Sequence, residues 1–600
     1  STPEKNLVVT GFYAPSYEQE AKCADLELNV LVYMENVTRE ITGAVKKGMT
    51  DDEALKARKA AIARIEKKSK EKTGLRSNVV DLYHGGEYWL YRYKKYTDIR
   101  LVCAPERQAA YFGGDYDNFT YPRYDLDFCF FRVYENGKPI KSEHYFKWNA
   151  KGAAKDELVF VSGNPGSTDR LYTYSQLEYE RDIRNPLILN YIDKWVKILR
   201  DYSKKGKEQQ RRALIRIFGL ENSRKAYTGM LQGLQDEELM KKKKRDEDNF
   251  RKMIAADPEW QSAYGDAWDT ISEVIQKARK TTKQSFYRRM RGSRLAGYAS
   301  TIVRYATEIK KPDKNRLDGF HDSQLDELKF SLFSPAPIYT DMEESTLAGL
   351  LQLSLDELGP DDPFIKTVLD GKTPAAVAKN LIGGTKLAEV DFRKKLFNGG
   401  QKAVEESKDP LIVTARKLDP VMRKWEEWQK KNIESVLTAA SEKIAKARFA
   451  AYGKSTYPDA TFTLRLAYGT VKGYPMNGTV APYKTTLYGL YDRSLSFDKK
   501  RDWWLPERFW QRKDQLDLST PVNFVSTCDI IGGNSGSPVI NQKAEIVGLI
   551  FDGNIESLPG RYIFDESKNR AVAVHTAYII EALRKLYDAG KLADEIEGIK

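Results

Sequence analysis

Residues 532–539 read Gly532-Gly533-Asn534-Ser535-Gly536-Ser537-Pro538-Val539, a turn typical of a serine nucleophile. The glycines let the backbone turn so that the N–H groups of Gly533 and Ser535 face one point beside the serine hydroxyl, as an oxyanion hole requires. The alternative is a glycine-rich hairpin with an idle serine, but such a turn needs only one or two of these residues. We therefore expect Ser535 to be a nucleophile and Gly533 to contribute to the oxyanion hole.

Strand patterns dominate both ends of the chain. Residues 1–175 alternate apolar and polar side chains in runs such as 89–93, 99–103 and 158–161, and they include one charged helix over 51–72. Residues 457–600 begin with Phe462, Leu464, Leu466 and Tyr468 at every second position, which predicts a half-buried strand. A strand over 545–551 follows the serine turn, and a helix over 576–589 ends the chain.

The middle of the chain, residues 176–456, has a helical pattern instead. Apolar residues recur at helical spacing, as at Leu187, Leu189, Tyr191, Ile192, Trp195, Val196 and Leu199. We expect an α+β protein in which a large all-helical domain, residues 176–456, is inserted between two parts of a strand-rich domain, residues 1–175 and 457–600.

Composition excludes several other classes of protein. The net charge of +13 is moderate for 600 residues. The basic run Lys241–Arg245 is flanked by acidic residues, so it predicts a solvated helix face and no nucleic-acid partner. No apolar run approaches the roughly 18 residues of a membrane span. The four cysteines have no CxxC spacing, so we expect no metal and no cofactor, and inert buried thiols at Cys103 and Cys129.

A serine nucleophile needs a base and a carboxylate that orients the base. Asp127 opens the run Asp127-Phe128-Cys129-Phe130-Phe131-Arg132-Val133, where a carboxylate entering an apolar strand must have a partner. Asp115, Asp117 and Asp125 compete for the role, but they lie in a loop rich in glycine and asparagine, where turn-forming carboxylates are common. We expect Asp127 to be the orienting carboxylate.

The stretch Phe112–Phe128 resembles a motif of the family-46 serine dipeptidyl-peptidases of bacteria, FGGDxDNWxWPRHTGDF. Tyr96–Val102 resembles the family's YxDVRLV, Ile530–Pro538 its DITGGNSGSP, and Phe551–Asn554 its FDGN. The resemblance implies a chymotrypsin-like double β-barrel with an inserted helical domain. It also implies a periplasmic or secreted homodimer without a metal, which releases dipeptides from the free N-termini of peptides.

Carried over position by position, the resemblance assigns further roles. Ser535 is the nucleophile, Asp127 the triad carboxylate, and Asn118 and Asp552 match residues that hold the substrate's α-ammonium group. Phe119 replaces the family's usual Trp and keeps an apolar wall without the indole N–H. Gly553 stands where arginine goes with acidic P1 side chains, so we expect an apolar P1. Asp529 belongs to the shared family pattern, so a basic P1 is the less favoured alternative.

Two departures from the family pattern bear on mechanism. Tyr124-Asp125-Leu126 replaces His-Thr-Gly. None of the four histidines, His84, His144, His321 and His575, has the sequence context of a chymotrypsin-like base. In the family the base precedes the part that matches Gly11–Ala14. We therefore expect the first barrel strands and the catalytic histidine to be missing, and this chain to be inactive alone.

Three hypotheses remain open from the sequence. The first is a serine exopeptidase that releases dipeptides from free N-termini through an acyl-enzyme. The second is a serine endopeptidase of the same barrel class. The third is a non-catalytic relative that binds peptides. Peptides with free or blocked N-termini separate the first two hypotheses, because only an exopeptidase requires the amine.

Overall fold

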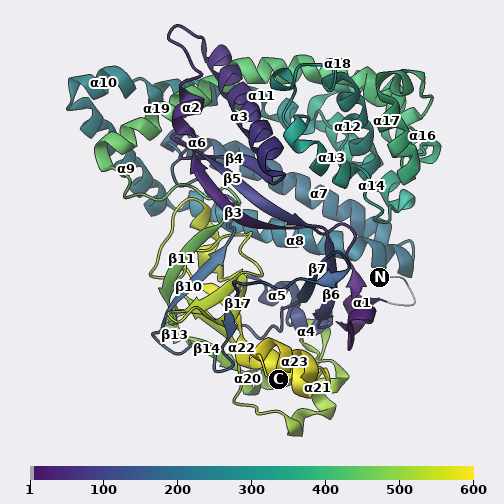
Figure 1. The fold of residues 1–600 in the computed structure, drawn as a ribbon, viewed down its shortest axis with the longest axis vertical. Helices are drawn as coiled ribbons and strands as arrows, with labels where there is room; N and C mark the ends of the chain where they lie inside the picture. The colour runs from purple at the N-terminus through teal and green to yellow at the C-terminus, as the bar shows by residue number, and fades with distance from the viewer. Residues whose placement is uncertain (1–5, 600) are drawn as a thin grey trace. The chain divides into compact units, whose positions relative to one another are not determined.

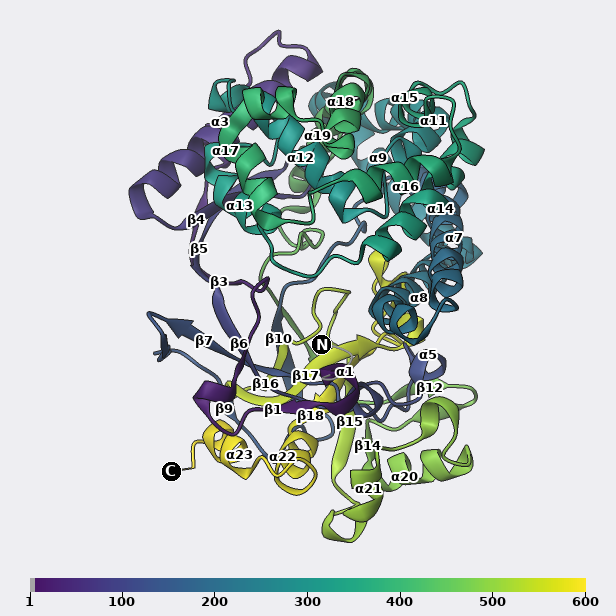
Figure 2. The same ribbon diagram turned by 90° about the vertical axis from the view of Figure 1, so that its right-hand side faces the viewer.

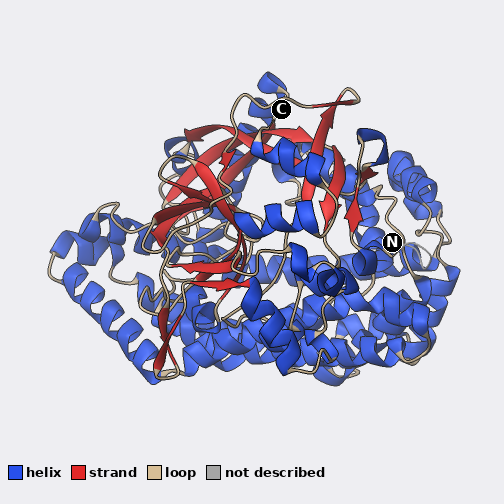
Figure 3. Ribbon diagram, turned by 90° about the horizontal axis from the view of Figure 1, so that it is seen from below, coloured by secondary structure: helices blue, strands red, loops and turns tan. Residues whose placement is uncertain are grey.

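The computed structural model describes residues 6–599 and divides the chain into two compact units. We call residues 29–95 and 172–458 the helical unit. We call the remaining residues, those up to Leu28, 96–171 and from Asp459 onward, the sheet unit. The predicted N-terminal part, residues 1–175, is thus shared between the two units, because residues 29–95 fold with the helices. Figure 3 colours the helices and strands of both units.

The helical unit contains long helices in the range predicted from sequence (Figure 1). The longest include α7 Asn185–Ser203, α8 Lys207–Gln235, α11 Ala267–Tyr287, α14 Thr340–Leu358, α18 Pro410–Gln429 and α19 Ser435–Tyr452. In α7, Tyr191, Ile192, Val196 and Leu199 are buried, as their spacing predicts. α7 packs against α8, and α14 packs against α7.

Helix α3, Asp51–Thr73, explains why residues 29–95 belong to the helical unit. A capping box formed by Thr50 and Glu53 starts the helix, and Gly74 in the left-handed region ends it. Arg58 of α3 forms a buried ion pair with Glu442 of α19. On another side α3 packs against β4, Arg76–Leu82, of a three-stranded sheet with order β3-β5-β4. The sheet's other strands are β3, Leu28–Asn36, and β5, Glu87–Tyr96.

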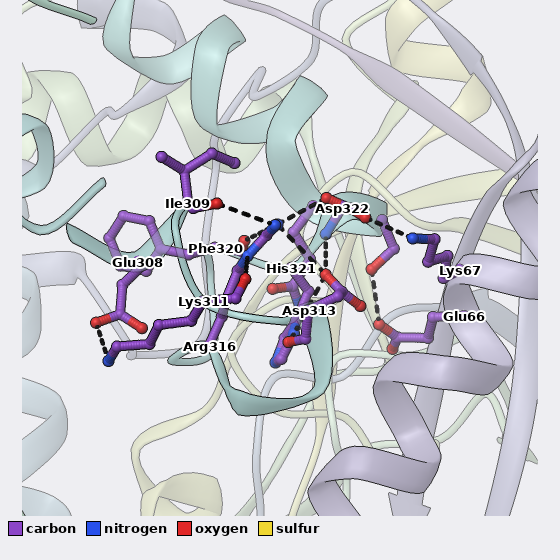
Figure 4. Close-up of polar contacts among 12 residues, drawn as sticks. Glu66, Lys67, Glu308, Ile309, Lys311, Asp313, Arg316, Phe320, His321 and Asp322 are labelled. Atoms are coloured by element: carbon purple, nitrogen blue, oxygen red, sulfur yellow. Dashed lines mark hydrogen bonds and ion pairs between the residues drawn. The ribbon is translucent and has the colours of Figure 1, made fainter. Parts of the chain in front are cut away.

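A polar network around His321 ties α3 to the segment that follows α12, Arg294–Glu308 (Figure 4). His321 is buried, and its Nδ1 lies 2.9 Å from the carbonyl oxygen of Asp313. Lys67 of α3 pairs with Asp322 at 2.7 Å. Burial opposes the imidazolium, but the carboxylates of Asp318 and Asp313 outweigh it, so the pKa of His321 is raised. His321 therefore has a structural role in the helical unit.

An eight-stranded sheet carries the serine turn. Its strands follow the order β11-β10-β16-β17-β18-β15-β14, where β14 is Lys484–Thr486, and β9, Lys147–Trp148, pairs with β17. Its antiparallel centre is β16, Pro538–Asn541, β17, Glu545–Gly553, and β18, Ala571–His575. The predicted terminal helix is α22, Thr576–Lys585, followed by a second helix, α23, Gly590–Glu597. α22 packs on β15, Pro521–Ser526, and on β17 and β18 (Figure 2).

A second sheet of five strands completes the sheet unit. β6, Asp98–Ala104, pairs with β1, Phe12–Tyr13, β2, Ala21–Lys22, and β7, Phe130–Glu135, and β7 pairs with β8, Lys138–Pro139. Val102, Cys103 and Phe128 pack in one apolar cluster with Tyr578 and Leu583 of α22. The thiols follow the prediction only in part, since Cys103 is buried and Cys129 is exposed.

The strand predicted to begin at Phe462 is β11, Arg465–Thr470, an edge strand paired with β10, Leu158–Gly163. Its apolar alternation faces the other way from the prediction: Leu466 is 64% exposed and Tyr468 is 72% exposed. On the inner face, position 469 has no room for a side chain, because a Cβ at Gly469 would lie 2.5 Å from the backbone nitrogen of Cys528. The alternation therefore predicted the strand correctly and its buried face wrongly.

Candidate active site

The serine turn lies between Cys528 and β16, and its glycines are required where the sequence predicts. Gly533 has φ +110° and Gly536 has φ +85°. A Cβ at Gly533 would lie 2.7 Å from both the carbonyl oxygen of Asn164 and the nitrogen of Gly166. The Gly166 N–H donates to the carbonyl of Gly532 at 2.8 Å and fixes the turn against this neighbouring loop.

Strand β17 positions Ser535. The Gly536 N–H donates to Ile550 at 2.7 Å, and the Ile550 N–H donates to Ser537 at 2.9 Å. The Ser535 side chain is exposed, and its hydroxyl donates to the carbonyl of Phe551 at 3.4 Å. Within residues 6–599, neither the Gly533 N–H nor the Ser535 N–H donates to a protein acceptor. Both donors are thus free for an oxyanion.

Asp552 stands near the end of β17, directly after Phe551, and is 8% exposed. Its Oδ2 accepts the backbone N–H of Phe119 at 3.0 Å and a guanidinium N–H of Arg123 at 2.6 Å. Its Oδ1 accepts the Gly553 N–H at 2.9 Å. The structure therefore brings together Ser535, Asp552, Phe119 and Gly553, four of the residues singled out from the sequence.

The loop that carries Phe119 is held in an unusual conformation. Phe119 has φ +57°, a left-handed conformation that is uncommon for a non-glycine residue. This turn aims the Phe119 N–H at Asp552. Asn118 precedes it at the end of the short helix α5, Gly114–Asp117, and is 4% exposed. Strained backbone of this kind is concentrated at functional sites, where surrounding contacts maintain it.

Arg123 and Asp125 belong to this site, although the sequence did not single out Arg123 and treated Asp125 only as a competitor for the triad. Arg123 is 2% exposed and Asp125 is fully buried, and their ion pair measures 2.8 Å. Burial raises the pKa of Asp125 to about 8, against the lowering effect of Arg123. The Arg-x-Asp spacing, beside a loop already assigned to the site, was the available signal.

Asp127 differs from the prediction in its surroundings. It lies three residues before β7 begins at Phe130, so it does not enter the strand, and its side chain retains access to solvent. Within residues 6–599 its carboxylate accepts no hydrogen bond. The surrounding protein nevertheless desolvates it and raises its pKa to about 6, with Arg123 lowering and Asp552 raising the value. The charge of Asp127 therefore interacts with those of Arg123 and Asp552.

The other competing carboxylates serve the loop itself. Asp117 is buried and accepts hydrogen bonds from Arg493 at 2.8 Å and from the Trp503 indole at 3.1 Å. Asp115 is exposed. Asp529 accepts two hydrogen bonds from Arg170, one of them at 2.8 Å, so its charge is already compensated. This pairing supports the expectation that Asp529 does not recognise a basic P1 side chain.

None of the four histidines contacts Ser535 or Asp127 in the part of the chain that the structure describes. His84 packs beside the ring of Tyr172 in the helical unit, and His144 is exposed. His575 is buried, and its Nδ1 accepts the Ala577 N–H at 3.2 Å and caps α22. Burial lowers the pKa of His575 to about 4, so it is a neutral structural residue.

Residues 6–599 meet the requirements of neither a metal site nor a membrane-spanning helix. No group of His, Cys, Asp and Glu side chains in this range is placed to hold a metal ion. No helix among these residues has the length and apolar character that a membrane crossing needs. The site offers the exposed hydroxyl of Ser535 and the free N–H groups of Gly533 and Ser535. It also offers the buried carboxylate of Asp552, which follows the Phe551 carbonyl that accepts from Ser535.

Comparisons with known proteins identify relatives along the whole chain. The dipeptidyl-peptidase 7 of Capnocytophaga gingivalis is 26% identical, over 99% of this chain and 86% of that protein. The Asp/Glu-specific dipeptidyl-peptidase of Shewanella putrefaciens is also 26% identical, over 100% of this chain and 87% of that protein. The crystal structure of Porphyromonas endodontalis DPP11 in complex with the dipeptide Arg-Glu matches with a TM-score of 0.78 and 21% identity. That match covers 100% of this chain and 89% of the solved chain.

A family model covers nearly the whole sequence. The model for peptidase S46 matches residues 1–598, which include the serine turn, the loop with Phe119 and Arg123, and the end of β17. This chain belongs to the peptidase S46 family.

Proposed function

We propose that the protein is a serine exopeptidase that removes dipeptides from peptides with a free N-terminus. The observation that carries the proposal is the position of Asp552 beside the nucleophile, because Ser535 donates to Phe551 and Asp552 is the next residue. A dipeptide spans only about 7 Å. An amine held at Asp552 would therefore bring the carbonyl of the second residue, and no later one, within reach of Ser535.

The charge of the site suits an ammonium group. Asp552 and Asp125 share one guanidinium, that of Arg123, so the three groups together carry a net negative charge when both carboxylates are ionised. A buried net charge is costly, and an α-ammonium group would compensate it. Asn118 lies beside Phe119 and can add an amide oxygen as a further acceptor.

The proposed chemistry is acyl transfer. Ser535 attacks the scissile carbonyl, and the N–H groups of Gly533 and Ser535 stabilise the resulting oxyanion. In this scheme Asp127 orients a histidine base and stabilises its protonated form. Because none of the four histidines contacts Ser535, we propose that a polypeptide of these 600 residues hydrolyses peptides only when a base is supplied.

We further propose an apolar P1 side chain. A Cβ at Gly553 would meet the Ser557 hydroxyl at 2.6 Å and the Ile530 Cδ1 at 3.7 Å, so the position is lined by neutral groups. The guanidinium of the nearby Arg570 is used by backbone carbonyls, including those of Gly473 and Glu566. Among the described residues, we therefore find no free cation beside Gly553 that could bind an acidic P1. The Shewanella putrefaciens relative, by its name, is Asp/Glu-specific.

A second candidate is a non-catalytic protein that binds peptide N-termini. The observation in its favour is that the Ser535 hydroxyl donates to a backbone carbonyl and has no described imidazole beside it. The amine anchor is the same in both candidates. Only turnover distinguishes them, and a serine endopeptidase of the same barrel class would lack the requirement for an amine.

Three expectations from the family resemblance stay proposals. We propose that the two sheets belong to a chymotrypsin-like double β-barrel, that the protein forms a homodimer, and that it acts in the periplasm or outside a bacterial cell. Light scattering of the purified protein tests the dimer, and fractionation of the producing cells tests the location. A monomer, or recovery from the cytoplasm alone, would contradict these proposals.

Mass spectrometry of peptide digests tests the function. A peptide with a free N-terminus and Phe at its second position is incubated with the protein and imidazole as the added base. The same peptide with an acetylated N-terminus serves as the control. The proposal predicts release of the N-terminal dipeptide from the free peptide only, and no release by the Ser535→Ala variant. Equal cleavage of the acetylated peptide would identify an endopeptidase instead.

A further inference from the structure

The amine anchor contains a second carboxylate for which acyl transfer alone provides no reason. Arg123 lies between Asp552, at 2.6 Å, and Asp125, at 2.8 Å. Arg123 and Asp552 alone would form a neutral pair. An ionised Asp125 therefore gives the cluster a net negative charge. We propose that Asp125 is a positioning residue that offsets Arg123 and thereby leaves Asp552 available to the substrate's α-ammonium. This inference rests on the proposed function.

The charge count shows what Asp125 changes. With Asp125 ionised, Asp125, Arg123 and Asp552 sum to one negative charge, and a bound ammonium group brings the sum to zero. Without the charge of Asp125, the guanidinium alone neutralises Asp552, and an ammonium group would make the buried cluster positive. Charges interact strongly in a buried site. The net charge of the cluster therefore favours ammonium binding only when Asp125 is ionised.

The protein holds Asp125 in a fixed position. The side-chain amide of Asn523 accepts the Asp125 N–H at 2.8 Å and donates to the Asp125 carbonyl at 2.9 Å. The Thr485 hydroxyl donates to the carbonyl of Arg123 at 2.8 Å. Asn523 is in β15, and Thr485 is in β14, Lys484–Thr486, so the ion pair is attached to the eight-stranded sheet. These hydrogen bonds hold the backbones of both Arg123 and Asp125 in place beside Asp552.

The energetic cost of Asp125 also argues for a function. Burial and the charge of Asp127 disfavour its ionised form, and Arg123 favours it, with a net pKa of about 8, so Asp125 is mostly protonated in the free protein at neutral pH. Replacing a buried ion pair by apolar residues is often neutral or stabilising. Stability alone therefore does not account for a fully buried carboxylate at this position. An ammonium group bound at Asp552 places a positive charge near Asp125, so we expect it to lower the pKa of Asp125 and to shift this carboxyl to its ionised form.

Calorimetric binding of two dipeptides tests the proposal without requiring turnover. The probes are Ala-Phe and N-acetyl-Ala-Phe, and the measured quantity is the ratio of their dissociation constants. Asp125→Asn keeps the side-chain shape and removes the charge. We expect it to weaken Ala-Phe binding about 10- to 100-fold and to leave the acetylated probe unchanged. A disturbed fold would weaken both probes. Asp169→Asn, which affects a buried ion pair with Arg561 elsewhere in the sheet unit, is the matched control and should leave the ratio unchanged.

A double variant removes the ion pair while keeping the net charge. In Arg123→Met with Asp125→Leu, Asp552 alone supplies the negative charge, so we expect the preference for the free amine to return toward that of the unmodified protein. A preference as low as in Asp125→Asn would show that the ion pair acts through structure and would overturn the proposal. Should Asp125→Asn not fold, the double variant is compared with the unmodified protein, and a loss of its preference for the free amine would overturn the proposal.

The experiment separates this inference from the function on which it rests. If the unmodified protein binds Ala-Phe no better than its acetylated form, the proposed function fails before any variant is considered. If it prefers Ala-Phe, and a folded Asp125→Asn variant keeps the full preference, only the role of Asp125 fails.

Discussion

The hydroxyl of Ser535 donates a hydrogen bond of 3.4 Å to the carbonyl of Phe551, the residue that precedes the buried carboxylate of Asp552. One strand, β17, thus carries the nucleophile's acceptor and the proposed amine anchor at adjacent positions. In the proposed function this adjacency would set the length of the product, because an amine held at Asp552 would lie two residues from the bond that is cut.

Asp127→Asn tests the cost of keeping a carboxylate at this site. The folded protein raises the pKa of Asp127 to about 6, from an ordinary value near 4. The ionised carboxylate therefore lowers the free energy of unfolding as the pH rises from about 4 to 6, and its full cost is present above about pH 6. We expect the variant to have a higher Tm at pH 7.5 and a difference that disappears toward pH 4. Because the side chain is exposed, the gain should be small.

The same variant should lose turnover. In a serine triad that holds its own histidine, replacing the aspartate by asparagine favours the wrong imidazole tautomer and lowers kcat by about 10⁴-fold. With imidazole supplied from solution we expect a loss in the same direction. Asp115→Asn, an exposed carboxylate of the same loop, is the control for turnover with a supplied base. An Asp127→Asn variant that is less stable at pH 7.5 and fully active would contradict both parts of the assignment.

His321→Gln probes the network of the helical unit. The pKa of His321 is raised in the folded protein, so its contribution to the free energy of unfolding is fully present below the unfolded value near 6.5. That contribution is lost as the pH rises through the folded pKa. The variant should therefore lose most Tm at pH 5.5 and least at alkaline pH. His144→Gln, at an exposed position, should show no such trend.

His575 should have the opposite pH dependence. Burial lowers its pKa to about 4, so its contribution is complete above pH 6.5 and is lost as the pH falls toward 4. The linked change is at most about 3 kcal/mol. Acid unfolding followed by circular dichroism should start at lower pH in His575→Asn, which retains a capping side chain without a titrating group. An unchanged acid limb would show that His575 does not titrate on unfolding.

Gly553→Arg should change the P1 preference. The added side chain would occupy the space beside Ser557 and Ile530 and bring a charge, so we expect at least a tenfold loss for Phe at P1. Asp or Glu at P1 should gain relative to Phe. Gly553→Ala is the steric control, with a smaller loss and no gain for acidic residues. Digestion of a peptide library, read by mass spectrometry, measures the preference, and an unchanged profile in Gly553→Arg would place the P1 pocket elsewhere.

Local patterns predicted much of this structure because each depends on a few adjacent residues. The turn at Gly533 and Gly536, the charged helix over residues 51–72 and the apolar stripe of α7 follow from glycine conformation, helix-favouring composition and periodicity. The family resemblance, and not a local pattern, implies that Asp529 does not recognise P1; this stays a prediction, and in the structure the carboxylate pairs with Arg170.

Features that depend on distant contacts could not be predicted in the same way. The outward face of β11 follows from the backbone next to Gly469, and residues 29–95 join the helical unit through Arg58 and Glu442. The pairing of Arg123 with both Asp125 and Asp552 joins residues more than 400 positions apart in the sequence. No periodicity or spacing within a single segment reveals such a contact.

The central claim is that Asp552 holds a free N-terminus beside Ser535, and the most direct measurement is the affinity of Ala-Phe for Asp552→Asn. The Ser535→Ala protein provides the reference, because it keeps the anchor and excludes turnover. We predict that Ser535→Ala binds Ala-Phe at least about 100-fold more tightly than Ser535→Ala with Asp552→Asn, and that both bind N-acetyl-Ala-Phe equally weakly. Equal binding of Ala-Phe by the two proteins would contradict the account.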